Sequence, residues 1–238
     1  VVDKTGTLTE GVVRLEGAYD DQGRRSDRVL VLAAANATLQ SGLSNPLDDA
    51  IQAAARAEPG RFRKVDEVPY DFIRKRMSVV VQEDSVIRIV SKGAFEQILA
   101  ICTRSGDGTT LTPEHLSEIR ARFTAWSTEG TRVLAIATRE LPQKPEYTRD
   151  DECDLQFLGF LTFLDHPKDG VVKTIDDLRR LGVSIKVITG DNRLVSQHVA
   201  AQVGLHPERT ITGKELSALH DEALWRIAET TEVFAEVD

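Results

Sequence analysis

The chain has 238 residues, of which 41% are hydrophobic and 29% are charged, and its formal net charge at pH 7 is −8. Such a chain can bury one large hydrophobic core or two modest ones. Its acidic balance argues against nucleic acid or an anionic membrane surface as a partner. The sequence contains no apolar run of membrane-spanning length and no signal peptide at its start, so we expect a soluble chain.

The cysteines and histidines give no sign of a metal site. Cys102 and Cys153 lie far apart in the sequence and match no metal or redox spacing. We therefore expect free thiols in a reducing compartment. The five histidines are scattered along the chain, which favours structural or surface roles.

The first part of the chain mixes predicted helices with alternating strands. After an opening turn, helical patterns cover residues 27–39, 46–58, 93–102 and 113–129, and strand patterns cover residues 65–70, 77–82, 86–90 and 132–138. Ile87 and Ile89 alternate with Arg88, which is typical of a half-buried antiparallel sheet. Gly130 is placed to end the last of these helices.

From Leu155 the pattern becomes that of an α/β domain. Residues 155–164 are apolar on both faces, as expected for a central parallel strand, and an amphipathic helix follows at 171–181. A buried strand at 183–191, a helix from Asp191 to Gly204 and a final strand at 232–237 predict right-handed βαβ units. Residues 1–11 and 155–238 then form one α/β domain, and residues 12–154 are an insertion.

Two polar turns follow predicted strands of this α/β domain. One is the run from Asp3 to Thr7 after Val1 and Val2, and the other is Thr189-Gly190-Asp191. Open α/β sheets place ligands at the carboxyl ends of their strands, where a carboxylate such as Asp3 can act as a nucleophile toward a phosphoryl group. A lone TGD sequence is equally compatible with an ordinary polar turn. The seven residues DKTGTLT are far more specific.

The DKTGTLT run at residues 3–9 resembles the phosphorylation signature of P-type cation-transporting ATPases. Further similar segments follow in the family's order: PYDFIRKRMSVVV at 69–81, SKGA at 91–94, TRVLAIA at 131–137, LDHPK at 164–168, TGD at 189–191 and VFAEV at 233–237. The resemblance covers essentially the whole chain. It is strongest to the bacterial magnesium-transporting branch.

The resemblance implies the fold and the catalytic residues. It implies an α/β phosphorylation domain of haloacid-dehalogenase type, with a parallel sheet, and an inserted α+β nucleotide-binding domain built on an antiparallel sheet. Asp3 would accept the phosphoryl group and, with the Thr5 carbonyl, would hold Mg²⁺. Lys4 belongs to the same loop. The phosphate-contacting motif is formed by Thr189, Gly190 and Asp191.

The resemblance also implies a set of residues that bind ATP. They are Asp48, Tyr70, Phe72, Lys75, Lys92, Gly93, Arg132 and Asp165. Tyr70 and Phe72 are rival candidates for stacking on adenine. Lys75 lies in a basic run that a solvated surface explains equally well, and Asp48 suits the first turn of a helix. We expect Lys92→Ala to weaken ATP binding and to leave the fold intact.

Three functions are compatible with these patterns. The chain is the ATP-binding and phosphorylation region of a cation pump, an isolated nucleotide-binding module without turnover, or a soluble phosphatase of the haloacid-dehalogenase class. In the first case ATP and Mg²⁺ are cofactors, and the parent lies in the cell membrane with this region in the cytoplasm. Its partners are then the membrane helices and the actuator domain. The resemblance implies that the parallel sheet continues beyond Asp238, so we also expect a possible homodimer through that sheet.

Overall fold

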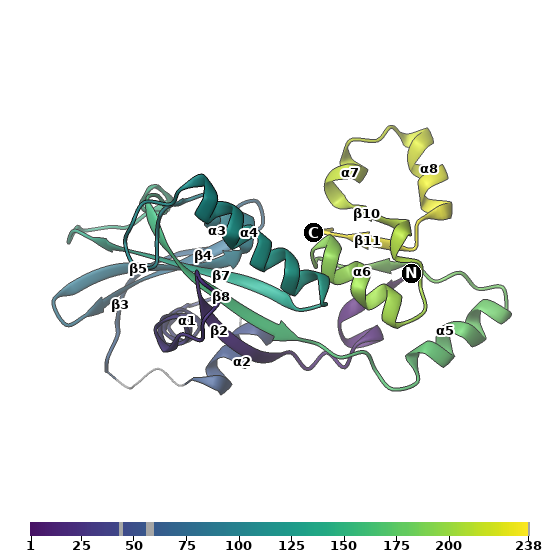
Figure 1. The fold of residues 1–238 in the computed structure, drawn as a ribbon, viewed down its shortest axis with the longest axis horizontal. Coiled ribbons are helices and arrows are strands. Elements are labelled where there is room, and N and C mark those ends of the chain that lie inside the picture. Colours follow the sequence, from purple (N-terminus) through teal and green to yellow (C-terminus); the bar gives the residue numbers. More distant parts are fainter. Residues whose placement is uncertain (43–44, 56–59, 238) are drawn as a thin grey trace. The chain divides into compact units, whose positions relative to one another are not determined.

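The computed structural model describes residues 1–42, 45–55 and 60–237. The chain forms two compact units (Figure 1). The smaller unit comprises Val1–Val13, Thr124–Arg132 and Leu164–Asp238, and the larger unit comprises Arg14–Phe123 and Val133–Phe163. None of the helices in the described part of the chain combines the length and the apolar content that a membrane span needs.

The larger unit is built on a seven-stranded sheet. Its strands are β2 (Arg14–Asp20), β3 (Arg63–Asp71), β4 (Arg76–Glu83), β5 (Val86–Ala94), β6 (Cys102–Ser105), β7 (Arg132–Leu141) and β8 (Leu155–Leu164). Their order is β2-β8-β7-β5-β4-β3, and β6 pairs with β8. The pairs β3–β4, β4–β5 and β5–β7 are antiparallel. The predicted inserted antiparallel sheet is therefore confirmed.

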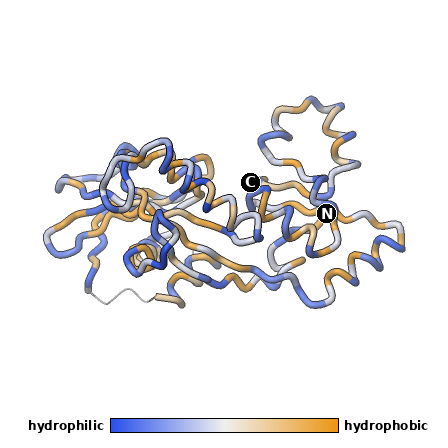
Figure 2. The backbone as a smooth tube through the Cα atoms, viewed as in Figure 1, coloured by the Kyte–Doolittle hydropathy of each residue, from blue (hydrophilic) through white to orange (hydrophobic). Residues whose placement is uncertain are grey.

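Helices cover both faces of this sheet. In Figure 1, α1 (Asp27–Leu39) and α2 (Pro46–Ala54) lie on one face, and α3 (Phe95–Leu99) and α4 (Pro113–Thr128) lie on the other. Phe95 packs between helix and sheet, with ring centroids 4.2 Å from Phe123 and 5.8 Å from Phe160. Figure 2 shows the hydrophobic residues running along the central strands. The core therefore lies on both faces of the sheet.

One strand prediction was wrong in an informative way. Residues 155–164 form β8 as predicted, but β8 belongs to the larger sheet, beside β2, β7 and β6, and not to the parallel sheet. Phe157, Phe160 and Phe163 in this strand are all fully buried. A strand that is covered by helices on both faces becomes apolar on both faces, whatever the direction of its neighbours. The pattern identified a central strand but could not identify its sheet.

The ends of two helices also differ from the sequence prediction. Gly93 and Ala94 complete β5 and Cys102 begins β6, so α3 is limited to Phe95–Leu99 and does not cover 93–102. Both segments are apolar, so composition does not separate the end of the strand from the start of the helix. Helix α2 begins at Pro46 as predicted and ends at Ala54, and the predicted end at Glu58 lies outside the described residues.

The smaller unit contains a parallel sheet. Its strands, in the order β1-β9-β11-β10, are β1 (Val2–Asp3), β9 (Val187–Ile188), β11 (Val233–Ala235) and β10 (Thr210–Thr212). All three pairings are parallel. Its helices are α5 (Val171–Arg180), α6 (Arg193–Gln202), α7 (Gly213–Ser217) and α8 (Asp221–Thr230). The core includes Leu8, Ile175, Val199 and Val233. The predicted α/β unit is therefore confirmed.

Two details of the smaller unit differ from the prediction. The strand expected over 183–191 is limited to Val187–Ile188. Asn192, not Asp191, caps α6, and its side chain accepts a hydrogen bond from the amide of Val195. Both residue types are good caps, so the choice depends on the Asp191 carboxylate being engaged elsewhere. The sequence prediction also omitted β10, α7 and α8.

We predict that the two thiols react at very different rates. Burial raises the pKa of the Cys102 thiol to about 12, and the nearby Arg76 charge offsets this only in part, whereas Cys153 is exposed. Because the thiolate is the reactive form, a thiol reagent at pH 8 should label one cysteine rapidly per chain. Cys153→Ser should remove the fast phase. Two fast thiols per chain would contradict this prediction.

Candidate functional site

The parallel pairing of β1 with β9 brings the two predicted turns to one edge of the smaller sheet. The register aligns Val2 with Val187 and Asp3 with Ile188. The residue after β9 is Thr189, whose amide donates to the carbonyl of Phe234 in β11. The Asp3 turn and the TGD turn therefore both leave the sheet at the carboxyl ends of neighbouring strands, where open α/β sheets place their ligands.

The loop after Asp3 turns back sharply through Lys4–Leu8. Gly6 lies in the left-handed region at φ 78°, which is favourable only for glycine, as the sequence predicted. Its amide donates to Oγ1 of Thr9 at 3.3 Å, and Nζ of Lys168 donates to its carbonyl at 2.5 Å. The loop is therefore held from within and from the segment that follows Asp165.

Asp165 fastens this loop to the chain segment that leaves β8. Its carboxylate accepts from Oγ1 of Thr9 at 2.6 Å and from the amide of Gly11 at 3.2 Å. No role was predicted for Thr9, although its hydroxyl lies within the DKTGTLT motif and was a usable signal. The resemblance placed Asp165 among the residues that bind ATP, and in the structure it lies beside the acceptor loop, where these hydrogen bonds engage both of its oxygens.

Asp191 is the centre of a buried charge cluster. Its carboxylate lies 2.5 Å from Nζ of Lys4 and 3.1 Å from Nη1 of Arg132, and Lys4 and Asp191 are each only 4% exposed. Burial alone would raise the pKa of Asp191. The charges of Arg132 and Lys4 outweigh burial and hold that pKa below its usual value. The Asp191 carboxylate therefore holds two positively charged side chains, those of Lys4 and Arg132, beside the Asp3 loop.

Asp3 itself is exposed, and its carboxylate makes no hydrogen bond or ion pair with any residue that the structure describes. It differs in this respect from Asp165 and Asp191 in the same cluster. A solvated carboxylate without a competing partner, next to fixed positive charge, has the chemistry of a nucleophile. Thr189 is buried and Gly190 is exposed in the facing turn.

The residues around Asp3 fit Mg²⁺ chemically. Mg²⁺ prefers oxygen ligands and is usually held by one or two carboxylates, with substrate phosphates and water completing its shell. The exposed Asp3 carboxylate and the Thr5 carbonyl supply oxygen donors of this kind. Within the described residues, no three acidic, histidine or cysteine side chains gather into a complete metal cage. The site suits an ion that arrives with a phosphate ligand.

The second group of predicted residues lies in the larger unit. Lys92 in β5 and Asp48 in α2 form an ion pair, and both side chains are buried. Asp48 also accepts from Nε2 of Gln40 at 2.5 Å and from Nδ2 of Asn45 at 2.6 Å. Burial lowers the pKa of Lys92, and the Asp48 carboxylate counters only part of that effect. The structure thus joins two residues that the sequence suggested separately.

The two candidate stacking residues lie at the hairpin between β3 and β4, with Tyr70 near the end of β3 and Phe72 in the turn that follows it. Tyr70 is 52% and Phe72 73% exposed, and their rings meet edge to face with centroids 5.4 Å apart. Exposed aromatic rings on a fixed turn can bind a flat apolar ligand. Lys75 belongs to the same turn and has a positive φ of 46°. Both aromatic residues are therefore exposed to solvent on at least half of their surface.

Gly93 lies directly against this turn. A Cβ at Gly93 would come within 2.4 Å of the carbonyl oxygen of Lys75 and within 2.6 Å of Cβ of Arg76. The resemblance placed Gly93 among the residues that bind ATP. The structure shows that the backbone of the neighbouring turn already approaches this closely, so glycine is required for packing.

The predicted site residues therefore form two groups. The acceptor group in the smaller unit contains Asp3, Lys4, Thr5, Arg132, Asp165, Thr189, Gly190 and Asp191. The turn group in the larger unit contains Asp48, Tyr70, Phe72, Lys75, Lys92 and Gly93. Arg132 was expected in the nucleotide-binding insertion, and its ion pair with Asp191 places it in the acceptor group.

Comparison with known proteins identifies the family. The family described as "P-type ATPase, cytoplasmic domain N" matches residues 51–170, and the chain belongs to the P-type ATPases. The seven-stranded sheet inserted into a unit with a parallel sheet has the arrangement that the sequence resemblance implied.

Individual relatives are ion-transporting ATPases. The magnesium-transporting ATPase, P-type 1, of Salmonella typhimurium is 40% identical over 245 residues, which is 99% of this chain and 27% of that protein. The protein of the same name from Escherichia coli K12 is 38% identical over the same shares. Calcium-transporting ATPase 1 of Lactococcus lactis is 28% identical over 99% of this chain and 30% of its own length. The chain thus spans little more than a quarter of its curated relatives.

Proposed function

We propose that this chain is the ATP-binding and phosphorylation region of a membrane pump that moves a cation, with Mg²⁺ the best-supported cargo. The larger unit binds the nucleotide, and Asp3 in the smaller unit accepts the phosphoryl group. The observation that carries the proposal is the exposed Asp3 carboxylate, which has no partner among the described residues and lies at the same strand edge as the TGD turn. The similarity to magnesium-transporting ATPases over 99% of the chain supports the choice of cargo.

The proposed domain organisation follows the predicted plan. A phosphorylation domain receives a nucleotide-binding insertion after about residue 11, and the insertion was expected to end at residue 154. The position of β8 in the larger sheet supports a later return, after Phe163. The remaining parts of the pump, its membrane helices and an actuator domain, are the proposed partners, and this region faces the cytoplasm.

The chemistry is a phosphoryl transfer to a carboxylate. An Asp3 oxygen attacks the γ-phosphorus of ATP, the bond to the β–γ bridging oxygen breaks, and ADP leaves with the electron pair. Water later cleaves the aspartyl-phosphate, which restores the carboxylate and releases inorganic phosphate. Lys4, held by Asp191, keeps positive charge next to the acceptor. Bound Mg²⁺, held by Asp3 and the Thr5 carbonyl, would neutralise phosphate charge.

An ATP titration followed by amide chemical shifts tests this proposal. We expect shifts at Tyr70, Phe72, Lys75 and Gly93 on adding ATP, and further shifts at Asp3 and Thr189 that require Mg²⁺. Shifts confined to the turn group would mean a nucleotide-binding module without a working acceptor site. The complete absence of shifts at the turn group would contradict the nucleotide assignment.

Matched variants identify the stacking residue. Tyr70→Ala and Phe72→Ala each remove one exposed ring from the same turn, and neither ring is needed for the core. Loss of a base–aromatic contact costs about 1–3 kcal/mol of binding, so one of the two variants should weaken ATP binding by at least about fivefold. Equal, wild-type affinity in both variants would mean that neither ring stacks on adenine.

A further inference from the structure

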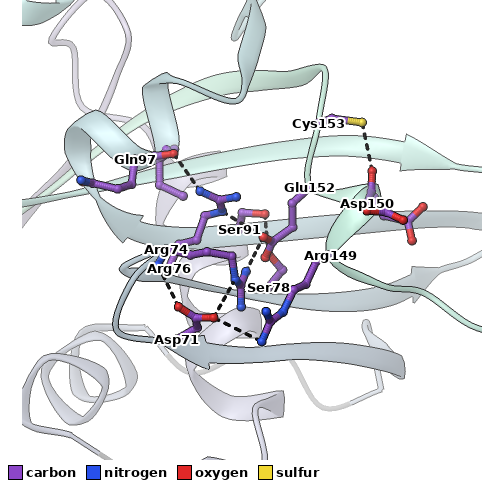
Figure 3. A network of polar contacts seen from close by, with 12 residues as sticks. Asp71, Arg74, Arg76, Ser78, Ser91, Gln97, Arg149, Asp150, Glu152 and Cys153 are labelled. Carbon is purple, nitrogen blue, oxygen red and sulfur yellow. Dashed lines mark hydrogen bonds and ion pairs between the residues drawn. The ribbon is translucent and has the colours of Figure 1, made fainter.

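Residues 70–75 at the β3–β4 hairpin, called the aromatic turn below, are bound by a buried carboxylate that is far away in the sequence. Glu152 lies in the connection between β7 and β8, directly after the short helix Arg149–Asp151, and its side chain is fully buried. Oε2 of Glu152 accepts from Nε of Arg76 at 2.9 Å and is ion-paired with Arg74. Figure 3 shows both arginines reaching to this single carboxylate. The turn is thus anchored across 76 to 78 residues of sequence.

The second oxygen of Glu152 is bound to the sheet below the turn. Oγ of Ser78 in β4 donates to Oε1 at 2.7 Å, and Oγ of Ser78 lies 2.6 Å from Oγ of Ser91 in β5. Both serines are completely buried. Ion pairs with two arginines and a serine hydroxyl together satisfy a charge that would otherwise be costly to bury. Glu152 therefore joins the turn to the two central strands that support it.

Arg74 transmits this anchoring to the backbone of the turn. Its Nη2 donates to the carbonyl of Pro69 at 2.8 Å, which is the residue before Tyr70. Oδ1 of Asp71 accepts from the amides of Ile73 and Arg74 at 2.8 and 2.9 Å, and the Asp71 carbonyl accepts from the amide of Lys75 at 2.7 Å. Oδ2 of Asp71 is paired with Arg149 at 3.2 Å. Both sides of the turn are therefore fixed by charged groups from the β7–β8 connection.

The side chains of Arg74 and Arg76 are mostly buried. Phe72 and Ile73, which precede Arg74 in the sequence, are 73% and 91% exposed. We propose that Glu152 is a positioning residue for nucleotide binding, which holds Arg74 and Arg76 so that Tyr70, Phe72 and Lys75 are presented in a fixed geometry. This inference rests on the proposed nucleotide-binding role of the turn. Its physical basis is pre-organisation: a turn already ordered before binding loses less conformational entropy when the ligand arrives.

The test combines hydrogen exchange without nucleotide and ATP affinity in Glu152→Gln. This variant keeps the shape of the side chain and removes its charge. The amides of Ile73, Arg74 and Lys75 should exchange about tenfold faster, because local opening becomes easier, while the amides of Val79 and Val80 in β4 keep their protection. ATP should bind about tenfold more weakly, since charge-assisted hydrogen bonds order the turn.

Asp150→Asn is the matched control. It removes a carboxylate from the same short helix, and the Asp150 side chain makes no hydrogen bond or ion pair with the described residues. In Figure 3 its carboxylate points away from Arg74 and Arg76. This variant should keep wild-type exchange and affinity. Arg74→Gln provides a second test from the other side of the contact, with Glu152 still bound to Arg76 and Ser78, and should accelerate the same three amides.

Each outcome has a definite meaning. Wild-type exchange of the three turn amides in both Glu152→Gln and Arg74→Gln would overturn the inference. So would faster exchange with unchanged ATP affinity, because the turn would then be held for another reason. If the wild-type chain itself binds no ATP, the proposed function fails, while the exchange data still decide whether Glu152 orders the turn.

Discussion

Replacing Lys92 by alanine should destabilise the larger unit by about 3–5 kcal/mol, because the change leaves the carboxylate of Asp48 buried without its cation. Asp48 is completely buried, and its remaining partners, Gln40 and Asn45, are neutral amides that cannot replace the charge. Urea denaturation of the variant measures this change in the free energy of unfolding. The sequence alone suggested that this variant would keep an intact fold, because the ion pair of Lys92 with Asp48 is not apparent from the sequence.

Lys64→Ala is the matched control for this prediction. Lys64 lies in β3 of the same sheet and pairs with Glu67 at 2.8 Å, but both side chains are partly exposed. Surface ion pairs contribute about 0–1 kcal/mol, so this variant should unfold at nearly the wild-type urea concentration. If Lys92→Ala is as stable as Lys64→Ala, the buried pair does not stabilise the fold.

The double variant Asp48→Asn with Lys92→Met separates stability from ligand binding. Removing both charges together should recover most of the lost stability, because no unpaired charge stays buried. ATP binding can then be measured in a folded protein. Wild-type affinity in the double variant would mean that Lys92 acts only through Asp48, whereas lost affinity would support a direct contact between Lys92 and the nucleotide.

Replacing Asp3 by asparagine should reduce acid-stable labelling from γ-labelled ATP to background in the intact pump that carries this sequence. The amide is isosteric but cannot act as the phosphoryl acceptor. ATP affinity should not fall, because Asp3 is exposed, has no partner among the described residues and belongs to a different compact unit from Tyr70 and Phe72. Removing one negative charge near a phosphate also lowers repulsion. Labelling and equilibrium binding are measured on the same preparation.

Glu10→Gln is the control for the acceptor. Glu10 is an exposed acidic residue of the same segment, and its backbone amide donates a hydrogen bond to the carbonyl of His166. This variant should be labelled from γ-labelled ATP to the same extent as the wild-type protein. Wild-type labelling of the Asp3→Asn variant would mean that another carboxylate is the phosphoryl acceptor. A large loss of ATP affinity in that variant would contradict the separation of the nucleotide and acceptor sites.

Much of the fold could be predicted because local patterns are strong where one face of an element is buried. The alternation in β5, the stripe on α5 and the apolar run of β8 all predicted the right kind of element. Local patterns do not reveal which strands pair. The apolar run of β8 predicted a place in the parallel sheet of the α/β unit, yet β8 lies in the larger sheet, beside β7, β2 and its parallel partner β6, because helices on both faces give the same composition in either kind of sheet.

The candidate site divides in the same way. The DKTGTLT and TGD runs determined, from sequence alone, which residues would meet at a strand edge, since consecutive βαβ units place their turns together. Only the tertiary structure decided how charges are paired: Lys4 and Arg132 with Asp191, Lys92 with Asp48, and Arg74 and Arg76 with Glu152. These partners are far apart in the sequence. A charged residue carries no local signal of whether solvent or a distant opposite charge will compensate it, and the packing of the folded chain makes that choice.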